Sequence, residues 1–597
     1  MAKLLECAPE CMRRLALLAF VVLTATALSA APRPNILILL VDDQGYGDFS
    51  CHGNPIIKTP NLDRLHDESV RFTDFHVAPM CTPTRGQLMT GLDALRNGAT
   101  SVTAGRSFLR PGIPTMPEIF RKAGYRTGIF GKWHLGDNYP HRPIDKGFED
   151  AVWLKGWGLT SAPEFTNTHF DGRCCRGAAE SRFKGYITDF CFDEAMKWMR
   201  ERAAKREPFF CYLPLNAAHA PLVVADKYSA PYAGKVGPKV ASFFGMIANI
   251  DENLARLEAS LRETGLRDDT ILIFMTDNGG TAGLKTFNAG LRGQKTEYYE
   301  GGHRVPCWVC WPAGKLRRPA DLDMPTQNQD LLPTLVDFCA VGADVRRLTI
   351  EKSPKLPSPG HGHYDFDGAS LEPLLRGKDD SLPDRMLVVQ YGQIPKKWDS
   401  CVIWNQWRLV KGEELYDVHA DRAQQHDLVT QHKDVVEKMR AHYEKWWAGI
   451  EPRLNDFVTI SLGAGQANQV QLTSSDWQGV YADNSGHIER AEGGPRGGPW
   501  NVSVDRAGDY EFSLRRWPPE LDLPLTAAFS TNSKALPIAA ARLTIAGQDR
   551  SLKTAPGDKE VVFRLSLPAG KTQLRAWFQD ADGHDLTGAY YARVTRK

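Results

Sequence analysis

The sequence is poor in long apolar runs, in net charge and in cysteine for a chain of 597 residues. After residue 31 no apolar run approaches the roughly 20 residues that cross a bilayer, so no stable membrane insertion is expected. The formal net charge is only +2, which argues against a nucleic-acid-binding surface. Twelve cysteines are too sparse for a disulfide scaffold. Burial of apolar side chains must therefore hold the fold together.

The N-terminus has the order of parts of a signal peptide. Arg13 and Arg14 precede the apolar run Leu15 to Leu28, and the small residues Ser29 to Ala31 follow. We expect residues 1–31 to be removed and the chain to be secreted or periplasmic; uncleaved, the run would be an anchor, the less favoured interpretation. Cys7 and Cys11 leave with the peptide, and adjacent Cys174 and Cys175 could form disulfides whose connectivity the sequence does not give.

Four apolar runs in the first half of the chain each end in polar residues. They are Asn35 to Val41 before Asp42-Asp43, Thr127 to Phe130 before GKWHLG, Phe209 to Leu213 before NAAHAPL, and Thr270 to Thr276 before Asp277-Asn278-Gly279-Gly280. Helical periods lie between them, in Phe192 to Met199 and Met246 to Leu261. This alternation predicts an α/β sandwich with a mainly parallel sheet. Ligands bind beyond the carboxyl ends of such strands, so the polar clusters should meet at one edge.

Each polar cluster also has an interpretation without chemistry. Asp42-Asp43 is equally a helix cap or turn, Asp-Asn-Gly-Gly taken alone is better read as a turn, and His219, Lys132 and Lys295 could be ordinary loop or surface residues. Their common position after strands or in Gly-rich loops is hard to attribute to chance. The carboxylate and amide oxygens of Asp42, Asp43, Asp277 and Asn278 suit calcium or magnesium. A hard cation with lysines nearby fits a tetrahedral oxyanion ester.

Cys81 stands in the exposed-looking segment HVAPMCTPTRGQLMTG. Pro83 predicts that Cys81 lies at the N-terminus of a helix that carries Arg85, where negative charge is stabilised. A helix-capping cysteine without chemical interest is the alternative. A plain thiol is a poor nucleophile for a hard sulfur or phosphorus centre, and a poor ligand for a hard cation.

CTPTR at Cys81 to Arg85 resembles the C-x-P-x-R signature of the type I sulfatase family, in the alkaline phosphatase-like superfamily. DDQGYGD, GKWHLG, HAPL, TDNGG and LRGQKTEYYEGGHRVP are similar to its further motifs in the same order, and LYDVHADRAQQHDL resembles its closing subdomain. The resemblance covers roughly residues 34–447. It implies that a dedicated maturation enzyme oxidises Cys81 to formylglycine, whose hydrate supplies two oxygens in place of the sulfur.

The resemblance also implies roles for the candidate residues. Asp42, Asp43, Asp277 and Asn278 would hold one Ca²⁺ together with modified Cys81; Arg85 and His134 would orient and activate the hydrate; Lys132 and Lys295 would bind sulfate; and His219 would lie near the leaving group. The expected reaction is hydrolysis of a sulfate ester, on a sugar or glycan fragment with aryl sulfates as surrogates, through a covalent sulfate ester on residue 81.

The remaining chain divides by composition. Residues 32–380 are expected to form the catalytic domain, 381–450 a small α+β subdomain and 451–597 an accessory β-sandwich, because short alternating runs separate turns after Trp447. Trp477, Trp500, Trp517 and Trp577 are more often core residues than sugar platforms in such a sandwich. Arg346 to Asp367 is expected to be a surface loop near the active-site rim.

Two other functions remain open from the sequence. A phosphoester hydrolase of the same superfamily would have a similar site, although the motifs supply too few ligands for two zinc ions. A secreted carbohydrate-binding protein with an unoxidised, catalytically silent Cys81 is the alternative from another class.

Overall fold

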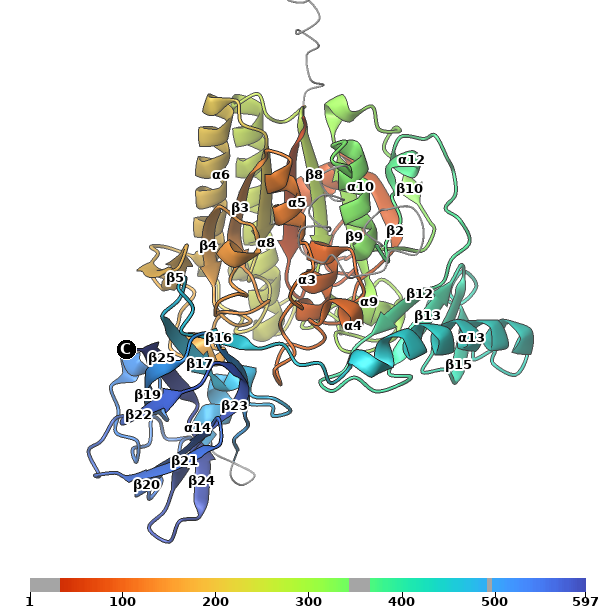
Figure 1. The fold of residues 1–597 in the computed structure, drawn as a ribbon. Helices are drawn as coiled ribbons and strands as arrows, with labels where there is room; N and C mark the ends of the chain where they lie inside the picture. Colours follow the sequence, from red (N-terminus) through yellow and green to blue (C-terminus); the bar gives the residue numbers. More distant parts are fainter. Residues whose placement is uncertain (1–32, 343–365, 491–495) are drawn as a thin grey trace, which may run out of the picture.

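A computed structural model of the chain describes residues 33–342, 366–490 and 496–597. The expected signal peptide and most of the predicted loop from Arg346 to Asp367 lie outside these residues. Figure 1 shows a large domain with two smaller units below it, a sheet with a long helix on the right and a group of strands on the left. The two smaller units therefore approach the same end of the large domain.

The large domain is built on one mixed sheet. Its strand order is β10-β2-β9-β8-β1-β7-β3-β4-β5-β6, with β11 paired to β2. The central strands β8, β1, β7, β3 and β4 run parallel, whereas β9, β5 and β6 pair antiparallel with their neighbours. The strands are β1 (Asn35–Val41), β2 (Val70–His76), β3 (Arg126–Lys132), β4 (Asp150–Leu154), β5 (Arg173–Arg176), β6 (Ala179–Arg182), β7 (Phe209–Pro214), β8 (Thr270–Thr276), β9 (Arg304–Cys310), β10 (Asp321–Leu322) and β11 (Thr326–Gln327). The four predicted strands are thus confirmed as its parallel centre.

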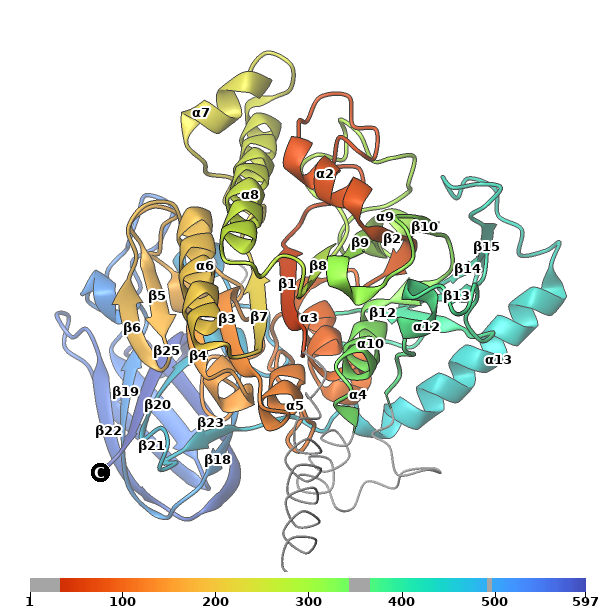
Figure 2. The same ribbon diagram turned by 90° about the horizontal axis from the view of Figure 1, so that it is seen from above.

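Helices cover both faces of this sheet, as Figure 2 shows from above. One core lies under α2 (Pro60–Glu68), α6 (Ile187–Lys205) and α8 (Pro238–Glu263), and the other under α3 (Cys81–Thr90), α5 (Met116–Lys122) and α10 (Leu331–Phe338). Alternate residues of β1 enter the two cores, Leu37 and Leu39 on one face and Ile36 and Ile38 on the other. A strand buried on both faces must be apolar throughout, which explains the uninterrupted run NILILLV.

The α+β subdomain is a four-stranded antiparallel sheet with one long helix. Its elements are β12 (Leu387–Gln390), β13 (Ser400–Trp404), β14 (Trp407–Val410), β15 (Glu414–Asp417) and α13 (Lys433–Ile450). Arg408 of β14 is fully buried and pairs with Asp74 of β2 at 2.8 Å and with Glu300 of α9 (Glu300–His303) at 2.6 Å. These ion pairs fasten the subdomain to the large domain.

The accessory unit is a β-sandwich of two sheets, ordered β16-β18-β23-β20-β21 with β24, and β17-β25-β19-β22. Its strands are β16 (Ile460–Leu462), β17 (Gln469–Thr473), β18 (Trp500–Val504), β19 (Gly508–Arg515), β20 (Ala540–Ile545), β21 (Gln548–Lys553), β22 (Val561–Leu567), β23 (Gly570–Gln579), β24 (Asp585–Gly588) and β25 (Tyr591–Arg596). Trp477, Trp500 and Trp517 are fully buried in its core, as the core interpretation predicts. The predicted fold class is confirmed, although the sequence prediction missed β21, β24 and β25.

The sandwich shares its core with the large domain. Phe108, Ala162 and Phe165 of the large domain belong to the same buried cluster as the sandwich tryptophans. Tyr591 donates a hydrogen bond to the carbonyl of Ala162 at 2.8 Å, and Arg173 pairs with Glu520 at 2.9 Å. The two units are therefore packed as one body.

Cysteines do not cross-link the described residues. The ten cysteines there are free, Cys174 and Cys175 among them, and the disulfide considered for that pair is absent. Cys307 and Cys310 lie in the buried strand β9, as the sequence indicates. None of the helices found in residues 33–342, 366–490 and 496–597 is long and apolar enough to cross a membrane.

Candidate active site

The predicted site residues gather where the central parallel strands end. Asp42 and Asp43 directly follow β1, and Asp277 and Asn278 directly follow β8. Lys132 closes β3, and Cys81 is the first residue of α3. His134, His219 and Lys295 come from the loops that follow these elements. Contacts join the side chains other than His134 and Cys81 into two groups, one around Asp42 and one around Asp43, and the backbone amide of Asp43 links them by donating to Asp277 Oδ1 at 3.3 Å.

Two glycines allow the backbones to approach closely at this edge. A Cβ atom on Gly131 would lie 1.9 Å from the carbonyl oxygen of Pro214, and one on Gly279 would lie 1.9 Å from that of Gly301. Both distances are far below van der Waals contact, so only glycine fits there. This explains why GKWHLG and TDNGG carry glycine beside the functional side chains.

Asp42 and Asp277 hold two buried cations. Lys132 Nζ is hydrogen-bonded to Asp42 Oδ2, and Arg85 Nη2 lies 3.3 Å from the same oxygen and 2.7 Å from Asp277 Oδ2. All four side chains are fully buried. Burial raises the pKa of Asp277 to about 6 despite Arg85 and Lys132, with Asp42 adding to the rise. The pKa of Asp42 is raised too, chiefly by burial, so a further cation at this position would favour the ionised form of both carboxylates.

Asp43 has a different environment. Lys295 Nζ and Asn278 Nδ2 donate to its Oδ1, the latter at 2.9 Å, and His219 Nε2 lies 3.7 Å from Oδ2. Burial favours the neutral acid, but Lys295 and His219 outweigh it and hold the pKa of Asp43 well below its usual range. The φ angle of Asp43 is 58°, a left-handed conformation that is costly for a residue other than glycine.

The donor set fits a hard divalent cation. Asp42 Oδ1 and Asn278 Oδ1 are buried without any hydrogen-bond partner. Asp42, Asp43 and His219 each offer one ligand atom, and the three atoms lie within 4.8 Å of one another. Buried oxygen atoms rarely stay unpaired, and carboxylate and amide oxygens are preferred ligands of calcium and magnesium. These residues can therefore hold such an ion.

Cys81 lies beside this cluster at the base of a cavity. It is buried, and burial raises the pKa of its thiol although Lys132 and Lys295 oppose that effect. As a neutral thiol it is a weak nucleophile. His134 shares the cavity; both of its ring nitrogens lack partners, and burial together with Lys132 and Arg85 holds its pKa well below the usual range. The ring is therefore neutral, and both nitrogens can contact a ligand in the cavity.

The cavity has a volume of about 390 Å³ and contains residues that the sequence prediction did not single out. Trp157 is one; its ring lies next to that of His219, with centroids 5.2 Å apart and the ring planes tilted by 41°. Tyr481, Asp483, Asn484 and Ser485 of the sandwich are further examples. No spacing rule links these positions to Cys81, so only the tertiary structure identifies them.

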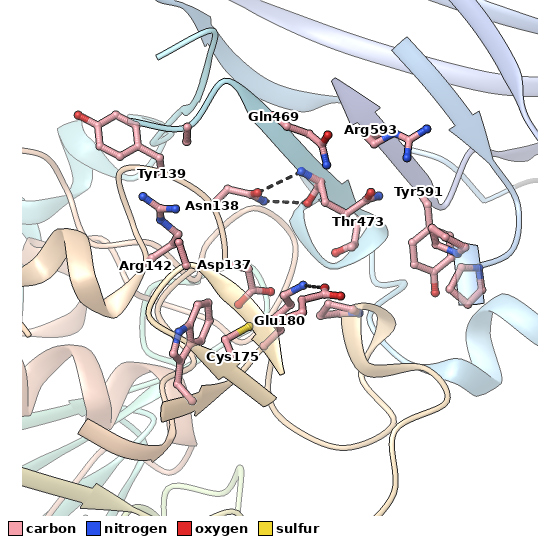
Figure 3. Close-up of a pocket in the computed structure, with 18 of the residues that line it drawn as sticks. Asp137, Asn138, Tyr139, Arg142, Cys175, Glu180, Gln469, Thr473, Tyr591 and Arg593 are labelled. Atoms are coloured by element: carbon pink, nitrogen blue, oxygen red, sulfur yellow. Dashed lines mark hydrogen bonds and ion pairs between the residues drawn. The ribbon is translucent and has the colours of Figure 1, made fainter. Parts of the chain in front are cut away.

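A larger cavity of about 460 Å³ lies between the large domain and the sandwich (Figure 3). Its walls include Asp137, Asn138 and Glu180 on one side and Gln469 and Arg593 on the other. None of the predicted site residues lines it. Despite its larger volume, it is an inter-domain gap bridged by hydrogen bonds between Asn138 and Gln471.

A mixed sheet with polar clusters at one edge and the signature CTPTR at a helix start define a member of the alkaline phosphatase-like superfamily. The sulfatase family model matches residues 34–341, and the chain belongs to that family. It is 31% identical to mouse N-acetylgalactosamine-6-sulfatase over 322 residues, 49% of this chain and 60% of that protein. Human arylsulfatase A is 30% identical over 399 residues, 60% of this chain and 70% of that enzyme.

A solved structure of similar fold is Ps i-CgsB in complex with k-i-k-neocarrahexaose. The TM-score is 0.61 at 25% identity, and the likeness covers 69% of this chain and 92% of that one. Mouse N-acetylgalactosamine-6-sulfatase is matched over only 60% of its length, and the family assignment rests on residues 34–341.

Proposed function

We propose that this protein hydrolyses a sulfate ester on a sugar or glycan fragment to the alcohol and inorganic sulfate. The observation that carries the proposal is the arrangement around Cys81. Cys81 lines a cavity. Around or next to this cavity lie two lysines, two histidines and the unpartnered buried oxygens of Asp42 and Asn278. A sulfate group carries negative charge on its oxygens, and this arrangement matches it with cations and a metal site.

The metal and the modified cysteine belong to this proposal. Asp42, Asp43, Asp277 and Asn278 would hold one calcium ion, with residue 81 as a further ligand after a dedicated maturation enzyme oxidises it. Formylglycine would supply an oxygen nucleophile, and calcium would polarise the sulfate. Burial favours protonation of Asp42 and Asp277. A hard cation would favour the ionised form of these two carboxylates beside the ionised Asp43.

The chain's own residues provide charge and orientation. The ion pairs with Asp42 and Asp43 fix Lys132 and Lys295 beside the cavity, and Asp43 is the main cause that raises the pKa of Lys295 against burial, so this amine stays protonated. Arg85 donates to the carbonyl of Lys132 at 2.9 Å, which ties the helix carrying Cys81 to the end of β3. Both lysines can therefore meet sulfate oxygens without reorganisation.

His219 is the proposed proton carrier near the leaving group. Its Nδ1 is hydrogen-bonded to the carbonyl of Ala220, so Nε2 faces Asp43. Burial lowers the pKa of His219 to about 4, although Asp43 opposes the shift. The neutral ring is an acceptor at Nε2, and it becomes a donor only when the charge of a bound sulfate raises its pKa. Lys295 is already protonated and is the alternative donor to the departing oxygen.

Mass spectrometry of the tryptic peptide containing residue 81, joined to a sulfate-release assay, tests the function. The protein is expressed together with a formylglycine-generating enzyme. We expect a peptide mass about 18 Da below that of the cysteine form and release of sulfate from 4-nitrophenyl sulfate, with much slower release of phosphate from 4-nitrophenyl phosphate. Full conversion of Cys81 without any sulfate release would contradict the proposal. Faster phosphate release would assign a phosphoester hydrolase instead.

A further inference from the structure

The sandwich completes the cavity above Cys81. The loop between η7 (Ser474–Asp476) and α14 (Ser485–Arg490) places Tyr481, Asp483 and Asn484 in the wall of the same cavity that contains Cys81, His134 and His219. Figure 1 shows the sandwich below the large domain, at the end where its site lies. An accessory unit appended more than 100 residues after the catalytic motifs thus reaches the site.

This loop is fixed to the large domain by backbone contacts. The amide of Ala162 donates to the carbonyl of Asp483 at 2.7 Å, and the amide of Ser485 donates to that of Thr160 at 3.1 Å. Ser161 and Asn484 form an antiparallel bridge. Because backbone contacts hold the loop against the large domain, its side chains have a defined geometry, as residues that determine substrate specificity require.

The wall has the composition of a sugar-binding surface. Tyr481 is about half exposed, with 49% of its surface accessible, and Trp157 offers a second aromatic ring next to His219. The carboxylate of Asp483 and the amide of Asn484 line the same cavity and are joined by a hydrogen bond of 3.2 Å. Aromatic rings pack against apolar ring faces, while a few convergent polar groups fix the orientation of hydroxyl groups.

The charge of the wall is opposite to that of the sulfate end. Lys132 and Lys295 lie at the metal cluster, whereas no lysine or arginine is among the described residues that line the cavity. Asp483 is the carboxylate on the sandwich side; Asn484 Nδ2 donates to its Oδ1 at 3.2 Å, and His487 Nδ1 lies 3.7 Å from the same oxygen. An ionised carboxylate accepts hydrogen bonds from hydroxyl or amide N–H groups and repels a second anion.

We propose that Trp157 and the sandwich loop Tyr481–Ser485 form the subsite for the sugar ring that carries the sulfate, and that Asp483 selects monosulfated sugars over sugars with a second anionic group. This inference rests on the proposed sulfatase function and extends it to the substrate. The cavity volume of about 390 Å³ is at the lower end of small-ligand pockets, which accommodates one sulfated ring.

The test compares sugar sulfates with an aryl sulfate on the matured full-length protein. The substrates are 4-nitrophenyl sulfate, the 6-sulfates of galactose, N-acetylgalactosamine and N-acetylglucosamine, and N-acetylgalactosamine 4,6-disulfate. For the monosulfate that is hydrolysed fastest, we expect Tyr481→Ala to lower kcat/KM at least tenfold, mainly through KM. The ratio of sugar-sulfate to aryl-sulfate kcat/KM should fall at least fivefold, because the small aryl ester depends less on the wall.

Asp483→Asn tests the selection against a second anion. The preference for N-acetylgalactosamine 6-sulfate over the 4,6-disulfate, measured as a ratio of kcat/KM, should fall at least fivefold. Leu552→Ala, on the exposed strand β21, removes an apolar side chain from the same sandwich and is the matched control, with both ratios unchanged.

Several outcomes would overturn the subsite. If Tyr481→Ala lowers kcat/KM equally for sugar sulfates and the aryl sulfate, the loop has a structural role only. If both loop variants leave the kcat/KM ratios between substrates unchanged, the loop does not contact the sugar. Wild-type protein that is active on 4-nitrophenyl sulfate but on none of the sugar sulfates would refute this inference while leaving sulfatase activity intact. Matured protein inactive on every ester would refute the proposed function and the subsite together.

Discussion

Two clusters of buried charge lie in this molecule, and they differ in how completely their polar atoms are paired. The first surrounds Asp42, Asp43 and Arg85 at the end of the central strands. The second connects the large domain to the α+β subdomain and consists of Asp74, His76, Glu300, His303, Arg304 and Arg408. Both consist mainly of charged residues and are largely shielded from solvent.

In the second cluster the hydrogen-bonding groups of the side chains are paired. Arg408 contacts both oxygens of Asp74 at 2.8 Å, and Glu300 is shared between Arg408 and Arg304. His303 bonds to His76 at one nitrogen and to the carbonyl of Tyr298 at the other. None of the side-chain atoms in these six described residues is buried without a partner. Although His76, Glu300 and His303 have the spacing of metal ligands, their donors and acceptors are already used.

The first cluster has hydrogen-bonding groups that are not paired. Asp42 Oδ1, Asn278 Oδ1 and both nitrogens of His134 have no partner. A buried polar atom without a partner costs roughly 1–3 kcal/mol, so a ligand that satisfies these atoms would stabilise the folded state. The comparison teaches that, of these two clusters of buried charge, the one beside Cys81 is the one with unpaired atoms to offer a ligand; unpaired buried atoms also occur elsewhere among the described residues, at Tyr125 and Trp477 for example. The following predictions test this distinction.

The largest effect should come from Cys81→Ala and should be confined to catalysis. Without a nucleophile at position 81 we expect release of sulfate from 4-nitrophenyl sulfate to fall at least about a thousandfold. The thermal unfolding midpoint should change little. Cys401→Ala, at a buried free thiol in β13, is the control that should retain activity. Equal activity losses in the two variants would contradict a special role of Cys81.

Arg408→Met should be the most destabilising change. It leaves the Asp74 and Glu300 carboxylates buried with fewer cations, and breaking such a buried pair costs about 3–5 kcal/mol. Chemical unfolding should show this loss. Arg564→Met removes an exposed partner of Glu511 and should cost under about 0.5 kcal/mol. A similarly small effect for Arg408→Met would show that the cluster is not a structural fastening.

Calcium should stabilise the protein through the first cluster alone. At a concentration of about one hundred times its Kd, a ligand that binds only the folded state adds roughly 3 kcal/mol. We expect the unfolding midpoint to rise with calcium and to fall with a chelator. Asn278→Ala should remove most of this response, and Asn468→Ala, at an exposed site in the sandwich, should keep it. A calcium response of equal size in both variants would place the ion elsewhere.

Asp48→Asn should change how stability depends on pH. Burial raises the pKa of Asp48 to about 7, although the amide of Gly45 opposes this. The folded state therefore holds the proton more tightly than the unfolded state, and wild-type stability declines as pH rises from about 4 to 7. Between pH 5 and 7 the variant should gain about 2 kcal/mol relative to wild type. Asp582→Asn, on an exposed turn, should show no such gain.

The sequence alone predicted the central sheet and most of the site. Runs such as NILILLV and TILIFMT are apolar on both faces, which only a buried parallel strand requires, and the polar residues after them must then share one edge. The start of a helix at Cys81 also followed from Pro83. These features are local or result from a general rule of topology, so one sequence is enough to predict them.

Only the tertiary structure showed which buried charges are saturated and which side chains close the cavity. Trp157 and Tyr481 lie more than 300 residues apart and meet through docking of the sandwich, which no sequence period encodes. The edge strands β21 and β24 were missed because exposed strands carry weak alternation. The strand β25 was missed although it lies between β17 and β19. Pairing between distant elements depends on how faces pack, so the fold, and not the motifs, decided which side chains line this pocket.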